Sequence, residues 1–207
     1  QSVYFSPEDL DLVKGEPAGR RDFLDRLLIT RSPRMAGVIS DYERIVKQRN
    51  VLLKTRSPQS SLVPWNEQLI SVGSNLTTER VRLCTAINPW AAESYANLNE
   101  VKHLEISYKS STKDLSSNIA ENRAVLTRKL EEVQYQEVER GLTLVGPHRD
   151  DLHLQLGQFP AKGYASHGES WSVAISLRLG AFNLLKNEGA EPILILDDIF
   201  SELDTYR

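Results

Sequence analysis

EPILILDD, at residues 191–198, is the segment that decides the fold. Four branched aliphatic residues follow Pro192 without polar alternation, a pattern typical of a strand buried on both faces of a parallel α/β sheet. Pro192 stands where this strand would begin, and its missing N–H is tolerated there. Because parallel strands present functional residues at their carboxyl ends, we expect Asp197 and Asp198 to lie at a functional site.

The two acidic residues that end this strand suit nucleotide chemistry. A carboxylate at the place of Asp197 can hold Mg²⁺ beside the phosphates of a nucleotide. A second carboxylate, that of Asp198, can orient or deprotonate an attacking water. This is the form of a Walker B strand. The alternative is structural: both residues cap the next turn or helix, and the segment by itself is equally compatible with that interpretation.

A second motif, Ser166-His167-Gly168-Glu169, precedes a helical pattern. Apolar residues recur on one face at helical spacing: Ala174, Leu177, Ala181, Leu184 and Leu185. The start of such a helix offers a hydroxyl, free N–H groups and positive polarisation, which together suit an anion. For this tetrapeptide alone, an ordinary N-cap is the favoured interpretation.

The order of these motifs is more specific than any one of them. Ser-x-Gly-Glu, a helix, a buried strand, Asp-Asp and then Ser-Glu-Leu-Asp at 201–204 resemble the second half of an ABC-type ATPase head, with its signature motif, Walker B strand and D-loop. Three blocks also resemble the RecF family, bacterial DNA-repair ATPases of the SMC-like group. They are FSPEDLDLVKGEP at 5–17, which runs on into RRDFLD at 20–25, VGPHRDDL at 145–152, and the region 166–204.

The resemblance implies an α/β fold: the second part of an ABC-type ATPase head, a P-loop NTPase fold, with a mostly helical inserted lobe. We expect residues 1–14 and 141–207 to belong to the head and residues 15–140 to form the lobe.

Periodicity predicts helices from residue 17 and over 35–53, 65–90 and 118–138, with strands at 3–6, 101–108, 142–145 and 152–156 and a polar loop at 54–61. The phosphate-binding pattern G-x-x-x-x-G-K-[ST] occurs nowhere in the sequence. We therefore expect the chain to be a piece whose Walker A loop lies upstream and whose last head strands lie downstream.

Composition sets limits on partners and compartment. The apolar fraction of 40% supports a real core, whereas the net charge of −3 does not by itself indicate a nucleic-acid binder. A DNA-binding surface would therefore have to be local or assembled by dimerisation. The single cysteine, Cys84, excludes an intrachain disulfide and fits a reducing compartment. No apolar run approaches the roughly 20 residues of a membrane span, so we expect a soluble cytoplasmic protein without membrane contact.

The resemblance also implies roles for individual residues. Asp197 would be the Mg²⁺ ligand, and Asp198 would stand in the place of the usual catalytic glutamate. Ser166 and Gly168 would contact the γ-phosphate of an ATP held by the other subunit, and Glu169 would belong to the nucleotide-binding set. His167 and Glu169 depart from the usual LSGGQ signature. Asp204 and Ser201 would form the D-loop, with Asp204 in the nucleotide-binding set.

Two further segments carry open alternatives. Residues 6–9 match the place of the Q-loop, which reaches toward Mg²⁺, but no Gln is present, and N-capping of the turn that starts at Pro7 is the competing explanation for Glu8 and Asp9. His148 and Arg149 could bind DNA phosphate, contact nucleotide, or lock their own loop by internal ion pairing.

The function that the resemblance implies is ATP-dependent DNA binding in recombinational repair and replication. Two heads would sandwich ATP and Mg²⁺, dimerise on single-stranded, double-stranded or junction DNA, and release it by slow hydrolysis, with RecO and RecR as partners. The complete protein would be a DNA-dependent ATPase, and this piece alone would be inactive. One alternative is another SMC-like head such as RecN, although the insertion is too short and interrupted for a long coiled coil. Another is a non-catalytic DNA-binding or interaction module.

Overall fold

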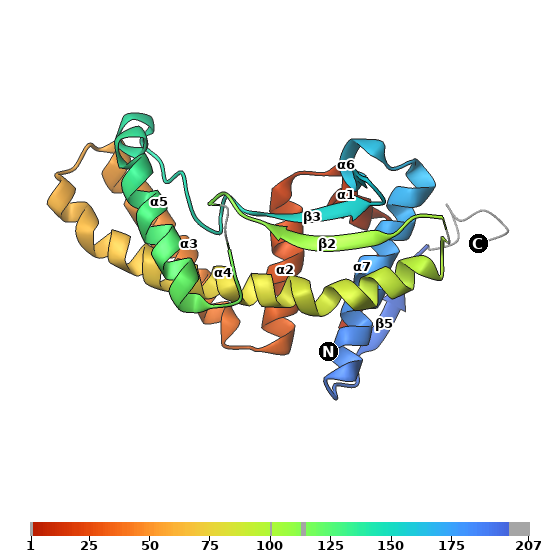
Figure 1. Cartoon of the computed structure of the whole chain (residues 1–207). Helices are drawn as coiled ribbons and strands as arrows, with labels where there is room; N and C mark the ends of the chain where they lie inside the picture. The colour runs from red at the N-terminus through yellow and green to blue at the C-terminus, as the bar shows by residue number, and fades with distance from the viewer. Residues whose placement is uncertain (1, 100, 113–114, 199–207) are drawn as a thin grey trace. The chain divides into compact units, whose positions relative to one another are not determined.

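A computed structural model of the chain describes residues 2–99, 101–112 and 115–198 (Figure 1). The chain forms two compact units. Unit 1 comprises the described residues of Gln1–Arg31, Leu83–Tyr108 and Asp151–Arg207, and unit 2 comprises Ser32–Arg82 and the described residues of Lys109–Asp150. These bounds differ from the expected head and lobe, because 15–31 and the described residues of 83–108 belong to unit 1 and 141–150 belong to unit 2.

Unit 1 holds the strands and the helices that pack on them. Its elements are β1 (Ser2–Phe5), the 3₁₀ helix η1 (Pro7–Leu10), α1 (Asp11–Lys14), α2 (Pro17–Arg31), most of β2 (Leu104–Lys109), β3 (Asp151–Leu156), β4 (Phe159–Pro160), the short α6 (Ala161–Tyr164), α7 (His167–Asn187) and β5 (Ile193–Leu196). Unit 2 holds α3 (Met35–Lys54) and α5 (Ile119–Arg140), and α4 (Gln59–Ala96) runs through both units.

Strands β1 and β5 form a parallel pair, with Tyr4 opposite Ile195 and Phe5 opposite Leu196. The strand predicted at 193–196 is confirmed, but its burial on both faces is not: Ile193 is 65% exposed and Ile195 46%. The buried residues of this pair lie in β1 instead, where Val3 and Phe5 alternate with exposed residues and face α7. Phe5 meets Trp171 of α7 edge to face, with ring centroids 5.3 Å apart.

The helix predicted after the signature motif is confirmed as α7, and its predicted apolar face is buried in unit 1. Most of its residues from Ser170 to Leu185 are buried. Gly180 allows a close approach to α4, because a Cβ at this position would lie 2.9 Å from the backbone of Ala91. The other sheet of unit 1 has the order β2-β3-β4. In β3 the apolar residues at even positions are buried, as the alternation predicted.

The predicted strand at 142–145 is wrong: these residues adopt no strand. Their backbone groups bond to side chains instead, since Thr143 N–H donates to Asn50 Oδ1 at 2.7 Å and Leu144 N–H to Glu137 Oε1 at 2.8 Å. The strands expected at 142–145 and 152–156 therefore do not pair with each other. The hairpin that does form joins β3 to β4 through a turn in which Gly157 has a φ of +62°.

The helices of unit 2 largely follow the predicted pattern. Asn118 caps α5 by accepting the N–H of Ala120, and Gly141 ends the helix with a φ of +66°, both as expected at helix ends. Figure 1 shows α5 alongside α3. The loop predicted at 54–61 is shorter than expected, because Pro58 initiates α4: its carbonyl accepts the N–H of Ser61 at 2.9 Å. None of the helices in the described ranges has the length and apolarity that a membrane crossing requires.

Candidate functional site

Asp197 lies at the carboxyl edge of the β1–β5 pair. Its N–H donates to the carbonyl of Phe5 at 3.0 Å, which extends the pairing by one residue beyond β5. Its carboxylate is exposed and accepts a hydrogen bond from the hydroxyl of Tyr4, with 2.8 Å between Tyr4 Oη and Asp197 Oδ2. This hydrogen bond to a carboxylate raises the pKa of Tyr4. The predicted metal ligand therefore stands at the end of the strand, as expected.

Asp198 leaves the strand with a φ of +51°, in the left-handed region that Asp tolerates better than most residues. Ser201 and Asp204, the predicted D-loop residues, lie outside the described residues.

The signature turn forms a reciprocal cap at the start of α7. Ser166 Oγ accepts the N–H of Glu169 at 3.2 Å, and Glu169 Oε2 accepts the N–H of Ser166 at 2.8 Å. This capping box is the N-cap that the tetrapeptide alone favours. It fixes the turn that contains Gly168, and it places the Ser166 hydroxyl at the positive end of a helix of 21 residues.

Two lysines from distant parts of the chain contact this turn. Lys102 Nζ lies 2.6 Å from Glu169 Oε1, and Lys14 Nζ lies 2.9 Å from His167 Nδ1. The hydrogen bond from Lys102, aided by the N–H of Ser166, lowers the pKa of Glu169. Sequence reasoning missed both lysines, because no local pattern links them to residue 167 or 169. Lys102 balances the charge of Glu169, and Lys14 adds positive charge beside His167, where an anionic ligand is expected.

The segment at the place of the Q-loop is anchored to α7. Arg178 donates to both oxygens of Asp9, with distances of 3.0 Å from Nε and 2.6 Å from Nη2. Asp9 also accepts the N–H of Ser6 at 3.2 Å, within a capping box that opens η1. The capping explanation is confirmed for Asp9. A hydrogen bond from the side chain of Ser6 lowers the pKa of Glu8.

The donor set of unit 1 fits Mg²⁺ bound together with a nucleotide. In such sites one or two carboxylates suffice, because waters and phosphate oxygens complete the octahedron. Across residues 2–99, 101–112 and 115–198 no group of three or more His, Cys, Asp and Glu side chains could enclose a metal ion. A single exposed carboxylate at a strand end, with Asp198 next to it, matches a site that waters and phosphate oxygens complete. It does not match a site in which protein side chains supply all the ligands.

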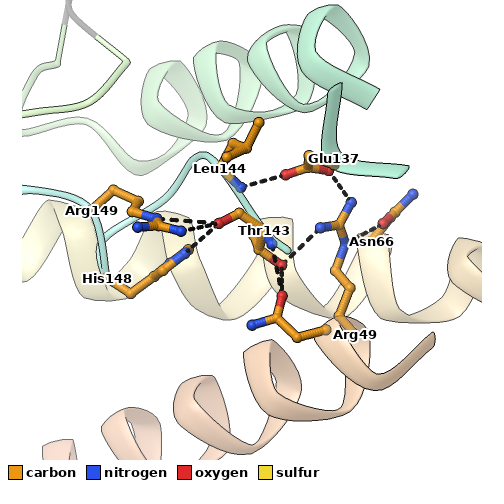
Figure 2. A network of polar contacts seen from close by, with 8 residues as sticks. Arg49, Asn66, Glu137, Thr143, Leu144, His148 and Arg149 are labelled. Carbon is orange, nitrogen blue, oxygen red and sulfur yellow. Dashed lines mark hydrogen bonds and ion pairs between the residues drawn. The ribbon is translucent and has the colours of Figure 1, made fainter. Parts of the chain in front are cut away.

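The loop that carries His148 and Arg149 is held from within unit 2 (Figure 2). The carbonyl of Thr143 lies 3.2 Å from His148 Nε2 and accepts Arg149 Nε and Nη2 at 3.2 and 3.0 Å. His148 Nδ1 lies 2.7 Å from the hydroxyl of Tyr42, whose burial raises its pKa. The loop-locking alternative therefore has direct contacts, which run to a backbone carbonyl and a phenol.

On the other side of Thr143 lies a buried ion pair between Arg49 and Glu137 (Figure 2). Their side chains are 1% and 0% exposed, and Arg49 Nη2 lies 2.5 Å from Glu137 Oε2. Arg49 also donates to Thr143 Oγ1 at 2.9 Å and to Asn66 Oδ1 at 2.8 Å. The pair thus ties α3, α4 and α5 to the segment at 143–144. No sequence pattern indicated this pair, because its two residues are simply charged positions on two amphipathic helices.

Comparisons with known proteins agree with this geometry. The chain is 49% identical over 218 residues to the DNA replication and repair protein RecF of Streptomyces avermitilis, and 43% identical over 230 residues to that of Cutibacterium acnes. Each alignment covers 100% of this chain, and the chain spans 58% of the length of each relative. No family model matches the chain.

Solved structures give the same result. A structure of the recombination mediator protein RecF with ATP, in the RecFOR pathway, matches 100% of this chain and 57% of its own, with a TM-score of 0.90 and 27% identity. A second, with ATPrS, matches 98% of this chain and 56% of its own, with a TM-score of 0.89 and 26% identity. The fold is accordingly that of the second part of an ABC-type ATPase head with a mostly helical inserted lobe. Sequence and fold alike show that this chain is similar to RecF proteins over the part of their length that it spans.

Proposed function

We propose that the complete protein is a cytoplasmic, ATP-dependent DNA-binding protein of recombinational repair and replication, which dimerises through its heads when ATP binds. The observation that carries this proposal is the joint presence, within unit 1, of Asp197 at a strand end and of the capped signature turn at residues 166–169. Further support comes from the similarity to RecF, of which solved structures are described with ATP.

In this proposal Asp197 holds Mg²⁺ and Asp198 orients the attacking water. Bound ATP with Mg²⁺ would supply the phosphoryl group that is cleaved and the charge that the head recognises. Asp198 has a shorter side chain than the glutamate usual at its position, so we expect hydrolysis to be slow.

The signature residues act on the nucleotide of the other subunit. Ser166 and Gly168 contact its γ-phosphate, with the N-terminus of α7 behind them. Because the capping box and Lys102 hold the carboxylate of Glu169, its contribution to nucleotide binding would be to fix the turn. Asp204 completes the contact as part of the D-loop. Since ATP then lies across the subunit interface, ATP binding and dimerisation are thermodynamically linked.

DNA, in single-stranded, double-stranded or junction form, is the proposed substrate of the dimer, and RecO and RecR are the proposed protein partners. We further propose that residues 1–14 and 141–207 act as the head and 15–140 as the lobe. The net charge of −3 means that the DNA-binding surface is local or is assembled when two heads meet. On this view ATP hydrolysis depends on DNA and releases it.

The first experiment measures the mass of the complete protein by light scattering, with and without ATP and Mg²⁺. We expect ATP to convert the wild type to dimers, Ser166→Arg to stay monomeric, and Asp198→Asn to give longer-lived dimers. Ser61→Arg is the matched control: it adds the same charge at an exposed position in α4 and should dimerise as the wild type does. Duplex binding, followed by fluorescence anisotropy, should require the dimer. If ATP leaves the mass of every variant unchanged, the chain belongs to a DNA-binding or interaction module instead.

A further inference from the structure

We propose that Tyr4 is a positioning residue for the proposed metal ligand Asp197. The Tyr4 hydroxyl holds Oδ2 of the carboxylate, and the orientation it fixes would present the remaining lone pairs of the carboxylate to a metal ion. This inference deepens the proposed function and rests on it, because it concerns the same strand end. Tyr4 itself touches neither metal nor nucleotide in this proposal, and it acts only through Asp197.

The register of the two strands explains why a tyrosine can do this. Tyr4 pairs with Ile195 across the parallel β1–β5 ladder, and side chains two residues apart lie on the same face, so Asp197 shares the face of Tyr4. A strand advances about 3.3 Å per residue, which puts Asp197 roughly 6.6 Å further along. The phenol ring spans this diagonal, and its hydroxyl reaches the carboxylate at 2.8 Å. A serine or threonine hydroxyl at position 4 would be too short.

Strand β1 holds Asp197 at two points. The carbonyl of Phe5 accepts the backbone N–H of Asp197, and the hydroxyl of Tyr4 fixes its side chain. Strand β1 is itself immobilised, because Phe5 is fully buried against Trp171. The rigidity of the α7–β1 packing is thus passed to an exposed carboxylate that would otherwise be free to rotate about its broad terminal torsion.

The chemical consequence is a carboxylate that is ordered before the metal binds. Hydrogen bonds to metal-ligating side chains orient them, and the loss of such a partner typically lowers metal affinity about 10- to 100-fold. Tyr4 is 45% exposed, so water partly replaces its hydrogen bond, and we expect the lower end of this range.

The test measures Mn²⁺ uptake by the complete protein in the presence of ATP, using the electron paramagnetic resonance signal of free Mn²⁺. An Asp198→Asn background slows turnover. Tyr4→Phe keeps the ring and removes the hydroxyl, and Tyr135→Phe, at an exposed tyrosine of α5, is the matched control. We expect Tyr4→Phe to weaken ATP-dependent Mn²⁺ binding about tenfold, with an unchanged melting temperature without metal and an unchanged ATP midpoint at saturating Mn²⁺.

The outcomes distinguish a failure of the role of Tyr4 from a failure of the proposed metal site. If Asp197→Ala abolishes the uptake while Tyr4→Phe binds Mn²⁺ as tightly as Tyr135→Phe, or more tightly, the role of Tyr4 is refuted and the metal site stands. If the wild type takes up no ATP-dependent Mn²⁺ and Asp197→Ala changes nothing, the proposed function fails and the role of Tyr4 falls with it. A Tyr4→Phe protein whose melting temperature drops without metal would mark Tyr4 as structural, which also refutes the inference.

Discussion

Asp197 in unit 1 and Glu137 in unit 2 are both carboxylates held by hydrogen bonds, yet they are held in opposite ways. The carboxylate of Asp197 is exposed, and one tyrosine hydroxyl contacts it at the end of a strand. That of Glu137 is fully buried, with one oxygen on Arg49 and the other on the N–H of Leu144. Because it is exposed, the carboxylate of Asp197 can bind a further ligand. The carboxylate of Glu137 serves only to stabilise the fold, because a buried charge must keep its partners.

The same contrast separates the two candidate loops. The signature turn is closed by its own capping box. Lys102 contacts Glu169 and Lys14 contacts His167, so basic side chains lie beside an exposed helix start. In the His148–Arg149 loop, both side chains contact the carbonyl of Thr143, and the hydroxyl of Thr143 accepts a hydrogen bond from the buried Arg49. The first arrangement is suited to binding an anion, and the second to keeping a loop in one conformation.

The largest expected effect comes from breaking the buried pair. Glu137→Ala leaves Arg49 buried without its counter-charge and removes the acceptor of Leu144 N–H, so we expect a loss of about 3–5 kcal/mol in the free energy of unfolding. Denaturant unfolding of the complete protein measures this loss, and hydrogen exchange should show faster exchange at the Leu144 amide.

Glu132→Ala is the matched control on the same helix. Its ion pairs with Lys129 and Arg128 are about half exposed on the glutamate side and are screened by solvent, so the change should lower the free energy of unfolding far less than Glu137→Ala does. Equal losses for Glu132→Ala and Glu137→Ala would contradict the contrast between the two regions.

A smaller effect is expected at the helix caps. Ser166→Ala removes the cap of α7, and Asn118→Ala removes that of α5, so each should cost about 1 kcal/mol of unfolding free energy. ATP-dependent dimerisation, measured by light scattering, should be lost in Ser166→Ala and retained in Asn118→Ala. Loss of dimerisation in both variants would show that stability, not the signature hydroxyl, controls assembly.

The smallest effect is a pH dependence at Glu169. Hydrogen bonds from Lys102 and from the N–H of Ser166 lower the pKa of Glu169 in the folded protein below its usual 4.5. The unfolded state therefore binds a proton first as pH falls. The stabilisation is complete above the unfolded pKa and disappears as pH drops through the folded one.

The measurement is the difference in unfolding free energy between wild type and Glu169→Gln from pH 7 to pH 3. This difference should be constant near neutrality and shrink below about pH 4.5. A difference that stays the same across the whole range would show that the charge of Glu169 does not contribute to the cap.

Local patterns predicted those parts of the fold that a few neighbouring residues specify. Asn118 and Gly141 mark the two ends of α5, alternation identifies the inward residues of β3, and the aliphatic run identifies β5. The segment at 142–145 was wrongly predicted as a strand, because its β-like composition is overridden by side chains of α3 and α5 that take its backbone hydrogen bonds. Likewise, Pro58 looked like part of a loop until the fold showed it at the start of a helix.

The sequence by itself determined the order of motifs, the capped start of α7 and the strand that ends in Asp197, since each depends on propensity, periodicity or capping within a short window. Only the tertiary structure decided which partners meet. Tyr4 and Asp197 are 193 positions apart, Asp9 and Arg178 are 169 apart, and Arg49 and Glu137 are 88 apart. The physical reason is that such pairs follow from strand register and helix packing, which bring distant segments together and leave no periodic signal in either one.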